Sequence, residues 1–212
     1  MTTLLKEQFN KILITDEHAF YNPSLTDIVK SPIWDVTSGA LYVKNSRAWT
    51  DSPIFRVITK RKDFKDVTVT FKLEINKFFS TAKTPAVDWD GVHIFLRYQS
   101  EHHLYVATVA RRDGKIVIKK KVPGGSSNSG TYHDLSSYAD KPFPLDNIEK
   151  VSATIRNIDG TVRIVLIVNG IVALDAIDNG TKGGSPIMNE GAVGIRGDNT
   201  EHYFDDFIVE TV

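Results

Sequence analysis

The residues that first suggest chemistry are the adjacent histidines His102-His103 and the acidic cluster Asp88-Trp89-Asp90. Histidine is a common zinc ligand, but adjacent residues on a strand point to opposite faces, so the pair does not offer both rings to one ion. The two histidines fall where we expect a hairpin turn, and capping that turn is the simpler interpretation. The acidic cluster also lies at an expected turn, which favours a loop over a catalytic site.

Other signatures of catalysis do not occur in the sequence. It contains no Gly-x-Ser-x-Gly, His-Glu-x-x-His or phosphate-loop pattern. The 212 residues include no cysteine, which excludes a disulfide framework, a thiolate metal site and a cysteine nucleophile. The 26 basic and 26 acidic residues are interspersed, so we expect no electric field that would attract nucleic acid or an anionic membrane.

The start of the chain bears on where the protein works. Lys6 and Glu7 interrupt the region where a secretory signal needs an apolar run. No segment reaches the roughly 18 to 20 apolar residues of a membrane helix. We therefore expect a soluble protein without membrane insertion, which is cytoplasmic or virion-associated if the chain is full length.

The elements that must position any site are β-strands. Short segments rich in Val, Ile, Thr, Tyr and Phe alternate with turn residues, and no helical periodicity extends beyond about two turns. Arg112-Asp113-Gly114-Lys115, Asp159-Gly160 and Asn169-Gly170 each separate two alternating segments, a pattern typical of antiparallel hairpins. The predicted strands are 4–10, 40–45, 54–59, 67–77, 91–99, 104–111, 115–122, 150–158, 161–168, 171–176, 191–197 and 203–211.

Two polar, glycine-rich stretches, Pro123 to Gly130 and Asp178 to Ser185, are predicted to be loops, and such loops often carry recognition. No linker composition or internal repeat divides the chain, so we expect one domain over residues 1–212. The predicted strands are too many for a small barrel and favour two stacked sheets.

Several segments in a fixed order carry a resemblance to a known fold family. They are Glu7-Gln8-Phe9, Trp34 to Leu41, Gly91 to Gln99, Leu104-Tyr105-Val106, Val162 to Gly170, Gly191 to Arg196 and Tyr203 to Val209. In this order they resemble the concanavalin A-like superfamily of lectins, glucanases and laminin-G modules. The resemblance covers most of the chain and implies an all-β, two-sheet antiparallel jelly-roll sandwich.

The resemblance also allows a test for family chemistry. Enzymes of the superfamily that cleave β-glucans carry Glu-x-Asp-x-x-Glu on one strand, because an acid and a nucleophile must flank one sugar bond, and this pattern does not occur here. Alginate-lyase relatives need Gln-x-His, whereas this chain has Tyr98-Gln99 without that histidine. The sequence therefore favours binding over catalysis.

Relatives often hold a structural Ca²⁺ between the first and last strands, with carboxylate and backbone oxygens as ligands. Glu7, Asp205 and Asp206 stand at the corresponding positions and are the predicted calcium ligands. The alternative is that one aspartate is solvated while the other accepts a hydrogen bond from the backbone.

A jelly roll has one curved sheet whose hollow face can receive a sugar chain. Alternation along strand 91–99 places Val92, Ile94, Leu96 and Tyr98 in the core and the other side chains in the hollow. We expect the hollow to be lined also by Arg111, Lys119 and Lys121, with Tyr132-His133 closing it. The predicted ligand-binding residues are His93, Arg97, Gln99, Tyr105, Trp49, Trp89 and His133.

Each of these assignments has a structural alternative. Arg97 would then pair with an acidic residue, Tyr105 would be a packing residue, and Lys119-Lys120-Lys121 would be a solvated edge. Trp34 is expected in the core.

The predicted function is non-catalytic binding of a glycan or of a cell or virion surface. The alternatives are a viral structural or attachment protein, for example of a phage tail or capsid, and a polysaccharide hydrolase or lyase with an unfamiliar site.

Overall fold

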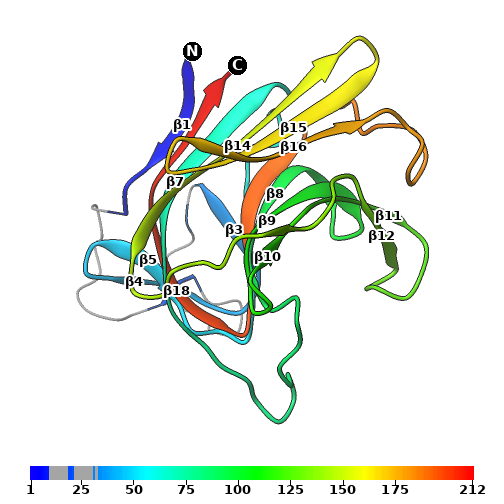
Figure 1. Ribbon diagram of the computed structural model, residues 1–212. Helices are drawn as coiled ribbons and strands as arrows, with labels where there is room; N and C mark the ends of the chain where they lie inside the picture. Colours follow the sequence, from blue (N-terminus) through cyan, green and yellow to red (C-terminus); the bar gives the residue numbers. More distant parts are fainter. Residues whose placement is uncertain (10–18, 22–30, 32) are drawn as a thin grey trace.

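The computed structural model describes residues 1–9, 19–21, 31 and 33–212. Two antiparallel β-sheets lie face to face as layers of a sandwich (Figure 1). The predicted all-β, two-sheet jelly-roll architecture is confirmed, and the described ranges contain no α-helix. In particular, no helix in this part of the chain is long and apolar enough to span a membrane.

The larger sheet has nine strands among the described residues. They are β1 (Thr3–Glu7), β2 (Ala19–Tyr21), β4 (Leu41–Lys44), β5 (Arg47–Thr50), β7 (Val67–Phe78), β14 (Ile148–Ile158), β15 (Thr161–Val168), β16 (Ile171–Asp178) and β18 (Thr200–Thr211). Their order is β16-β15-β14-β7-β18-β5-β4-β2, and β1 pairs with β18. The first and last strands therefore lie side by side, and both chain ends emerge together (Figure 1).

The smaller sheet has seven strands in the described part of the chain. They are β3 (Trp34–Ser38), β6 (Ile54–Thr59), β8 (Gly91–Ser100), β9 (His103–Arg111), β11 (Ile118–Pro123), β12 (Gly130–Asp134) and β17 (Ala192–Asp198). Their order is β12-β11-β9-β8-β17-β6-β3. Two short strands, β10 (Lys115–Ile116) and β13 (Ala139–Asp140), pair separately beside this sheet.

The tight turns form where the sequence predicts them. Asp159 and Gly160 have φ of 45° and 80°, and Asn169 and Gly170 have φ of 51° and 78°. Positive φ at both central residues is the type I′ geometry that matches the twist of a hairpin. These turns join β14 to β15 and β15 to β16, which confirms two of the three predicted hairpins. The turn at Arg112-Asp113-Gly114-Lys115 leads instead into β10 (Lys115–Ile116), which pairs with β13 (Ala139–Asp140), while β9 pairs with β11.

Aromatic packing between the sheets holds the amino-terminal part of the sandwich. Trp34 is fully buried, as predicted, and its ring centroid lies 4.8 Å from that of Phe207. Phe9 packs on Phe204 with a centroid distance of 5.3 Å. The predicted strand 4–10 is shorter than expected, because β1 ends at Glu7 and residue 10 lies outside the described residues.

A buried polar cluster fastens the smaller sheet to the end of β16. Lys120 on β11 places its Nζ 2.8 Å from Asp178 Oδ2, and both side chains are almost fully buried. The Tyr105 hydroxyl on β9 donates to the same oxygen at 2.7 Å and accepts the backbone N–H of Ile187 at 2.9 Å. Because a buried charge without its partner is strongly destabilising, this cluster fixes the segment that follows β16.

Candidate functional site

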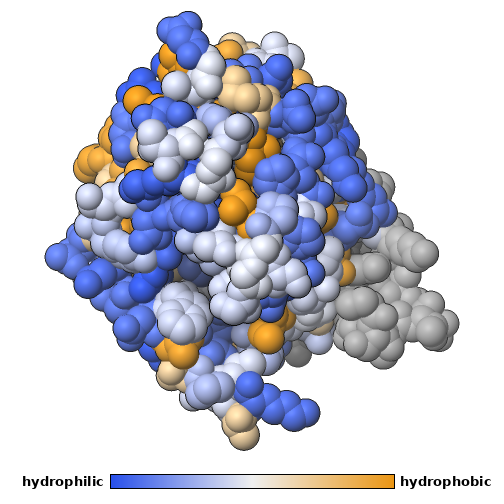
Figure 2. Space-filling model, turned by 90° about the vertical axis from the view of Figure 1, so that its right-hand side faces the viewer, coloured by the Kyte–Doolittle hydropathy of each residue, from blue (hydrophilic) through white to orange (hydrophobic). Residues whose placement is uncertain are grey.

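A pocket of about 430 Å³ opens on the face of the smaller sheet that points away from the larger sheet. Figure 2 looks onto the side of the molecule that lies at the right in Figure 1, where hydrophilic residues predominate and hydrophobic ones form separate patches. The pocket is lined by Trp89, His93, Val106, Thr108, Arg111, Lys119, Lys121, Ser126, Ser127, Asn128, Tyr132, Tyr138 and Arg196.

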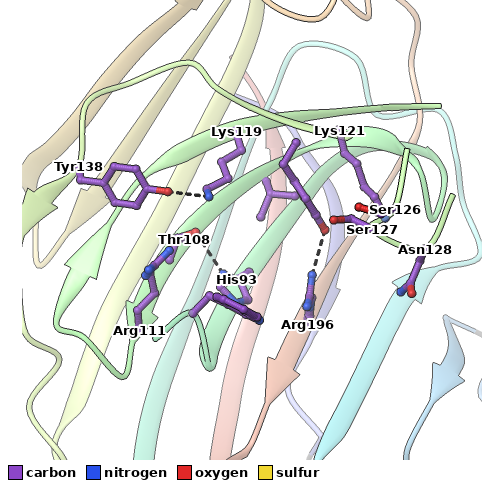
Figure 3. A pocket seen from close by; sticks show the side chains of 13 residues that line it. His93, Thr108, Arg111, Lys119, Lys121, Ser126, Ser127, Asn128, Tyr138 and Arg196 are labelled. Atoms are coloured by element: carbon purple, nitrogen blue, oxygen red, sulfur yellow. Dashed lines mark hydrogen bonds between the residues drawn. The ribbon is translucent and has the colours of Figure 1, made fainter. Parts of the chain in front are cut away.

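Strand alternation explains which side chains reach the pocket. On β9, Val106 and Thr108 line it, whereas Tyr105 and Ala107, which alternate with them, belong to the core of the sandwich. The same alternation on β11 turns Lys119 and Lys121 towards the pocket (Figure 3). The loop between β11 and β12, which the sequence predicts to be a recognition loop, adds Ser126, Ser127 and Asn128.

Aromatic rings stand at the edge of the pocket. Trp89 is 55% exposed and Tyr138 is 42% exposed, which is unusual for such large apolar surfaces. Exposed rings of this kind provide flat surfaces against which a ligand can stack. Tyr132 is the third aromatic residue in the lining.

His93 forms part of the pocket floor. Its ring is buried, and its Nδ1 lies 3.1 Å from Thr108 Oγ1 (Figure 3). Burial lowers the pKa of His93 well below its usual value, and the positive charges of Arg196, Arg111 and Lys119 lower it further. The carboxylate of Asp198 lies 3.6 Å from His93 Nε2, but it is already paired with Arg196 and does not offset the lowering of the His93 pKa. The imidazole is therefore neutral at neutral pH.

One end of the pocket combines an arginine, a lysine and a tyrosine whose charges are balanced. Arg111 donates from Nε and Nη2 to the two carboxylate oxygens of Asp113 at 2.8 and 2.6 Å. Lys119 Nζ donates to the Tyr138 hydroxyl at 2.8 Å and lies 3.2 Å from Asp134 Oδ1. Each of the two cations therefore has its own carboxylate.

The other end repeats the combination with a different charge balance. Arg196 Nη1 donates to the Tyr132 hydroxyl at 2.9 Å, and its Nε lies 2.5 Å from Asp198 Oδ2. Lys121 Nζ donates to the backbone carbonyl of Glu101 at 2.7 Å and lies 5.1 Å from the centroid of the Tyr132 ring.

The predicted orientation of Arg97 is wrong. Alternation along β8 holds up to Leu96, but the register with β9 shifts between Leu96 and Ser100, and Arg97 has a φ of 45°. This bulge turns Arg97 towards the larger sheet, where it is fully buried. Its guanidinium donates to the carbonyls of Lys65 and Ile187 and to the side chains of Asp66 and Asn157, at 2.7 to 3.1 Å. The structural alternative, pairing with an acidic residue, describes it correctly.

Three further predicted residues lie outside the pocket. Tyr105 is fully buried in the sandwich, where its hydroxyl donates to Asp178, the partner of Lys120. Gln99 follows the bulge and donates to the carbonyl of Glu190. His133 points away from Tyr132 and lies against Gly183 of the loop after β16. The bulges in β8 and β9 break the alternation from which the faces of Gln99 and Tyr105 were predicted.

The two tryptophans that were predicted to stack on a ligand lie in different parts of the molecule. Trp89 lines the pocket, and ligand binding by it and by His93 stays a prediction. Trp49 lies on β5 of the larger sheet, with its ring between Tyr42 and Tyr203 at centroid distances of 5.4 and 6.3 Å.

The predicted calcium ligands do not assemble into a metal site. Glu7 Oε1 accepts the backbone N–H groups of Gln8 and Phe9, at 2.9 and 2.8 Å. Asp206 pairs with Lys72 at 2.7 Å and accepts the Gln8 side-chain amide. No group of three or more His, Cys, Asp or Glu side chains that could hold a metal occurs among the described residues, so the structure shows no site there for the predicted Ca²⁺ at Glu7, Asp205 and Asp206.

Sequence reasoning missed four lining residues, Val106, Thr108, Tyr138 and Arg196. Arg196 had the clearest signal, because it is a charged side chain on a strand whose neighbours are glycine and apolar residues. Tyr138 lies in a segment without alternation, and its contacts with Lys119 and Arg111 bring it to the pocket.

No protein-family model matches the sequence, and no curated protein does either. Solved structures are nevertheless similar over the whole chain. One is a Bacillus subtilis protein of unknown function with a galectin-like fold, with a TM-score of 0.64 and 12% identity over 100% of this chain and 96% of that one. Another is an endo-1,3-β-glucanase from Streptomyces sioyaensis, with a TM-score of 0.60 and 11% identity over 100% and 97% of the two chains.

A third similar structure is the exoplasmic/lumenal domain of VIP36 in its Ca²⁺/Man3GlcNAc-bound form. The TM-score is 0.51 and the identity 10%, over 85% of this chain and 84% of that one. Likeness at such identities shows the fold. The chain has the lectin-like jelly-roll fold of the concanavalin A-like superfamily, as its sequence resemblance implied.

Proposed function

We propose that the chain binds a glycan, without cleaving it, in the pocket on the outer face of the smaller sheet. The observation that carries this proposal is the lining itself, in which exposed aromatic rings stand beside several hydrogen-bond donors. Proteins hold sugars with ring faces against the C–H surfaces and with polar side chains on the hydroxyls. A volume of about 430 Å³ also suits a small ligand.

The similar structures support a glycan as the class of ligand. The VIP36 domain is solved with Man3GlcNAc, and the Streptomyces protein is a glucanase. Because one fold hosts several activities, this likeness does not choose between binding and cleavage.

The chemistry of the lining favours binding. Glycoside hydrolysis uses two carboxyl groups on either side of the scissile bond, typically about 5 to 10 Å apart. No aspartate or glutamate lines the pocket in the part of the chain that the structure describes. The ionisable groups that do line it are lysine, arginine, tyrosine and a histidine that is neutral at neutral pH.

Two tryptophan variants test the proposal. A glycan array identifies the best ligand, and calorimetry then measures its affinity for the wild type, Trp89→Ala and Trp49→Ala. We expect Trp89→Ala to weaken binding about tenfold or more, because it removes the exposed ring at the pocket edge. Trp49→Ala is the matched control, since Trp49 lies on the other sheet.

The same samples separate binding from cleavage. We expect no new reducing ends after prolonged incubation of the wild type with the bound glycan. Release of reducing ends that is lost in His93→Ala would show a hydrolase, and equal weakening of binding by both tryptophan variants would place the ligand elsewhere.

A further inference from the structure

We propose that the saccharide bound in this pocket carries an acidic group, a carboxylate or a sulfate ester, which sits between Lys121 and Arg196. This inference rests on the proposed function and specifies the class of its ligand.

The pocket has a cationic pair at each end. In Figure 3, Arg111 and Lys119 lie on one side with Tyr138, and Lys121 and Arg196 lie on the other, beside the loop of Ser126 to Asn128. Because all four cations line the cavity and their carboxylate partners do not, ligand atoms would face positive groups. A formal net charge of zero means that this positive character is local to the pocket.

The two ends differ in how well their charges are neutralised. Arg111 and Lys119 each have a carboxylate partner, Asp113 and Asp134 respectively. At the other end, Asp198 pairs with Arg196. Lys121 has no carboxylate within 4 Å among the described residues, and its ammonium donates only to a backbone carbonyl. The excess positive charge is therefore at the Lys121 end.

The surroundings of Lys121 make this charge costly in the ligand-free protein. The residue is 3% exposed, and burial lowers its pKa to about 8, with further lowering by Arg196 and Arg56 that Glu101 only partly opposes. A buried, poorly compensated cation is expensive to maintain, and such groups cluster at functional sites. An anion bound beside Lys121 would supply the negative charge that this ammonium lacks.

Tyr132 organises the two cations around one position. Its ring lies under Lys121 Nζ, at 5.1 Å from ring centroid to nitrogen, and its hydroxyl accepts Arg196 Nη1 at 2.9 Å. An acidic group placed here receives charge-assisted hydrogen bonds from an ammonium and a planar guanidinium. The serine hydroxyls and the Asn128 amide of the adjacent loop are suited to neutral hydroxyls of the same sugar.

Matched glycan pairs test the inference. The array carries sialylated, sulfated and uronic-acid glycans, each beside its neutral parent, and calorimetry follows the best pair. We expect the acidic member to bind about tenfold or more tightly than its parent, which is the effect of one hydrogen bond to a charged group. Inorganic sulfate alone, as competitor, is expected to be far weaker than the acidic glycan, and equal competition would contradict a saccharide ligand.

Variants assign the effect to Lys121. We expect Lys121→Met to abolish the preference for the acidic glycan and Lys121→Arg to retain most of it. Lys62→Gln removes the same charge from an exposed position outside the lining and should leave both affinities unchanged. If Lys121→Met does not fold, the salt dependence of binding to the wild type provides the test. Only the acidic glycan should lose affinity when NaCl is raised from about 0.05 to 0.5 M.

The outcomes separate the two proposals. Equal affinity for the neutral and acidic members, unchanged in Lys121→Met, would overturn this inference and leave glycan binding intact. Binding of no glycan of either kind would overturn the proposed function itself.

Discussion

Three consecutive lysines show how one residue type has different roles at neighbouring positions. Lys119 and Lys121 line the pocket, whereas Lys120 between them is fully buried against Asp178. Alternation along β11 causes the difference. The run is therefore not simply a solvated edge, which was one interpretation of its sequence. Two of its members are available to a ligand, and the third stabilises the sandwich.

The pKa of Lys121 predicts how ligand binding depends on pH. An acidic glycan binds the protonated ammonium, and in the free protein that ammonium loses its proton with a pKa of about 8. Affinity should therefore be constant below about pH 7 and fall as the pH rises above about 8, by up to tenfold per unit. The measurement is calorimetry of the acidic glycan across this range.

The groups around Lys121 define the control for this pH profile. Arg196 and Arg56 disfavour its charge and Glu101 favours it, while Tyr132 lies against it. The arginines stay charged throughout, so Lys121→Arg should show constant affinity over the same interval. A fall of equal size in Lys121→Arg would assign the titration to another group.

At the scale of the elements, the sequence predicts the regular parts of the fold and fails at the irregular ones. Asp159-Gly160 and Asn169-Gly170 predict their hairpins because the turn chemistry is local. The bulge at Arg97 is not local, since contacts with Lys65 and Ile187, distant in the chain, hold it in place. Relative to β17, one extra residue in β8 reverses the faces that alternation assigns to the rest of the strand.

The candidate site was predictable to a similar extent. His93 and Trp89 reach the pocket, as do Lys119 and Lys121, because alternation or turn position alone places them. Arg196 joins them only because β17 lies beside β8 in the sheet, an adjacency that the sequence order does not reveal.

The buried cluster at the end of β16 gives the prediction at this scale. Asp178→Ala leaves the Lys120 ammonium buried without a countercharge, so we expect a loss of about 3 to 5 kcal/mol in the free energy of unfolding. Urea denaturation measures it. The control is Asp175→Ala, which breaks the surface pair with Arg163 and should change stability little. Similar losses in the two variants would show that burial of the Lys120 pair has no special importance.

At the scale of the whole molecule, the two sheets have separate tasks. The larger sheet closes the core and brings the two chain ends together on β1 and β18 (Figure 1). The smaller sheet presents the pocket on its outer face. Two buried cations, Arg97 and Lys120, connect the strands of the smaller sheet to residues on or beside the larger sheet and so support the shape of the pocket. Residues without any ligand contact are therefore expected to maintain the shape of the site.

The three tryptophans allow the most direct measurement of the central claim, that the ligand occupies the outer face of the smaller sheet. Trp34 reports on the core, Trp49 on the larger sheet and Trp89 on the pocket. In a titration of the ¹⁵N-labelled protein with the best-binding glycan, followed by the indole N–H signals, we predict that the Trp89 signal shifts while those of Trp34 and Trp49 stay in place. A shift of Trp49 with an unmoved Trp89 would contradict the claim.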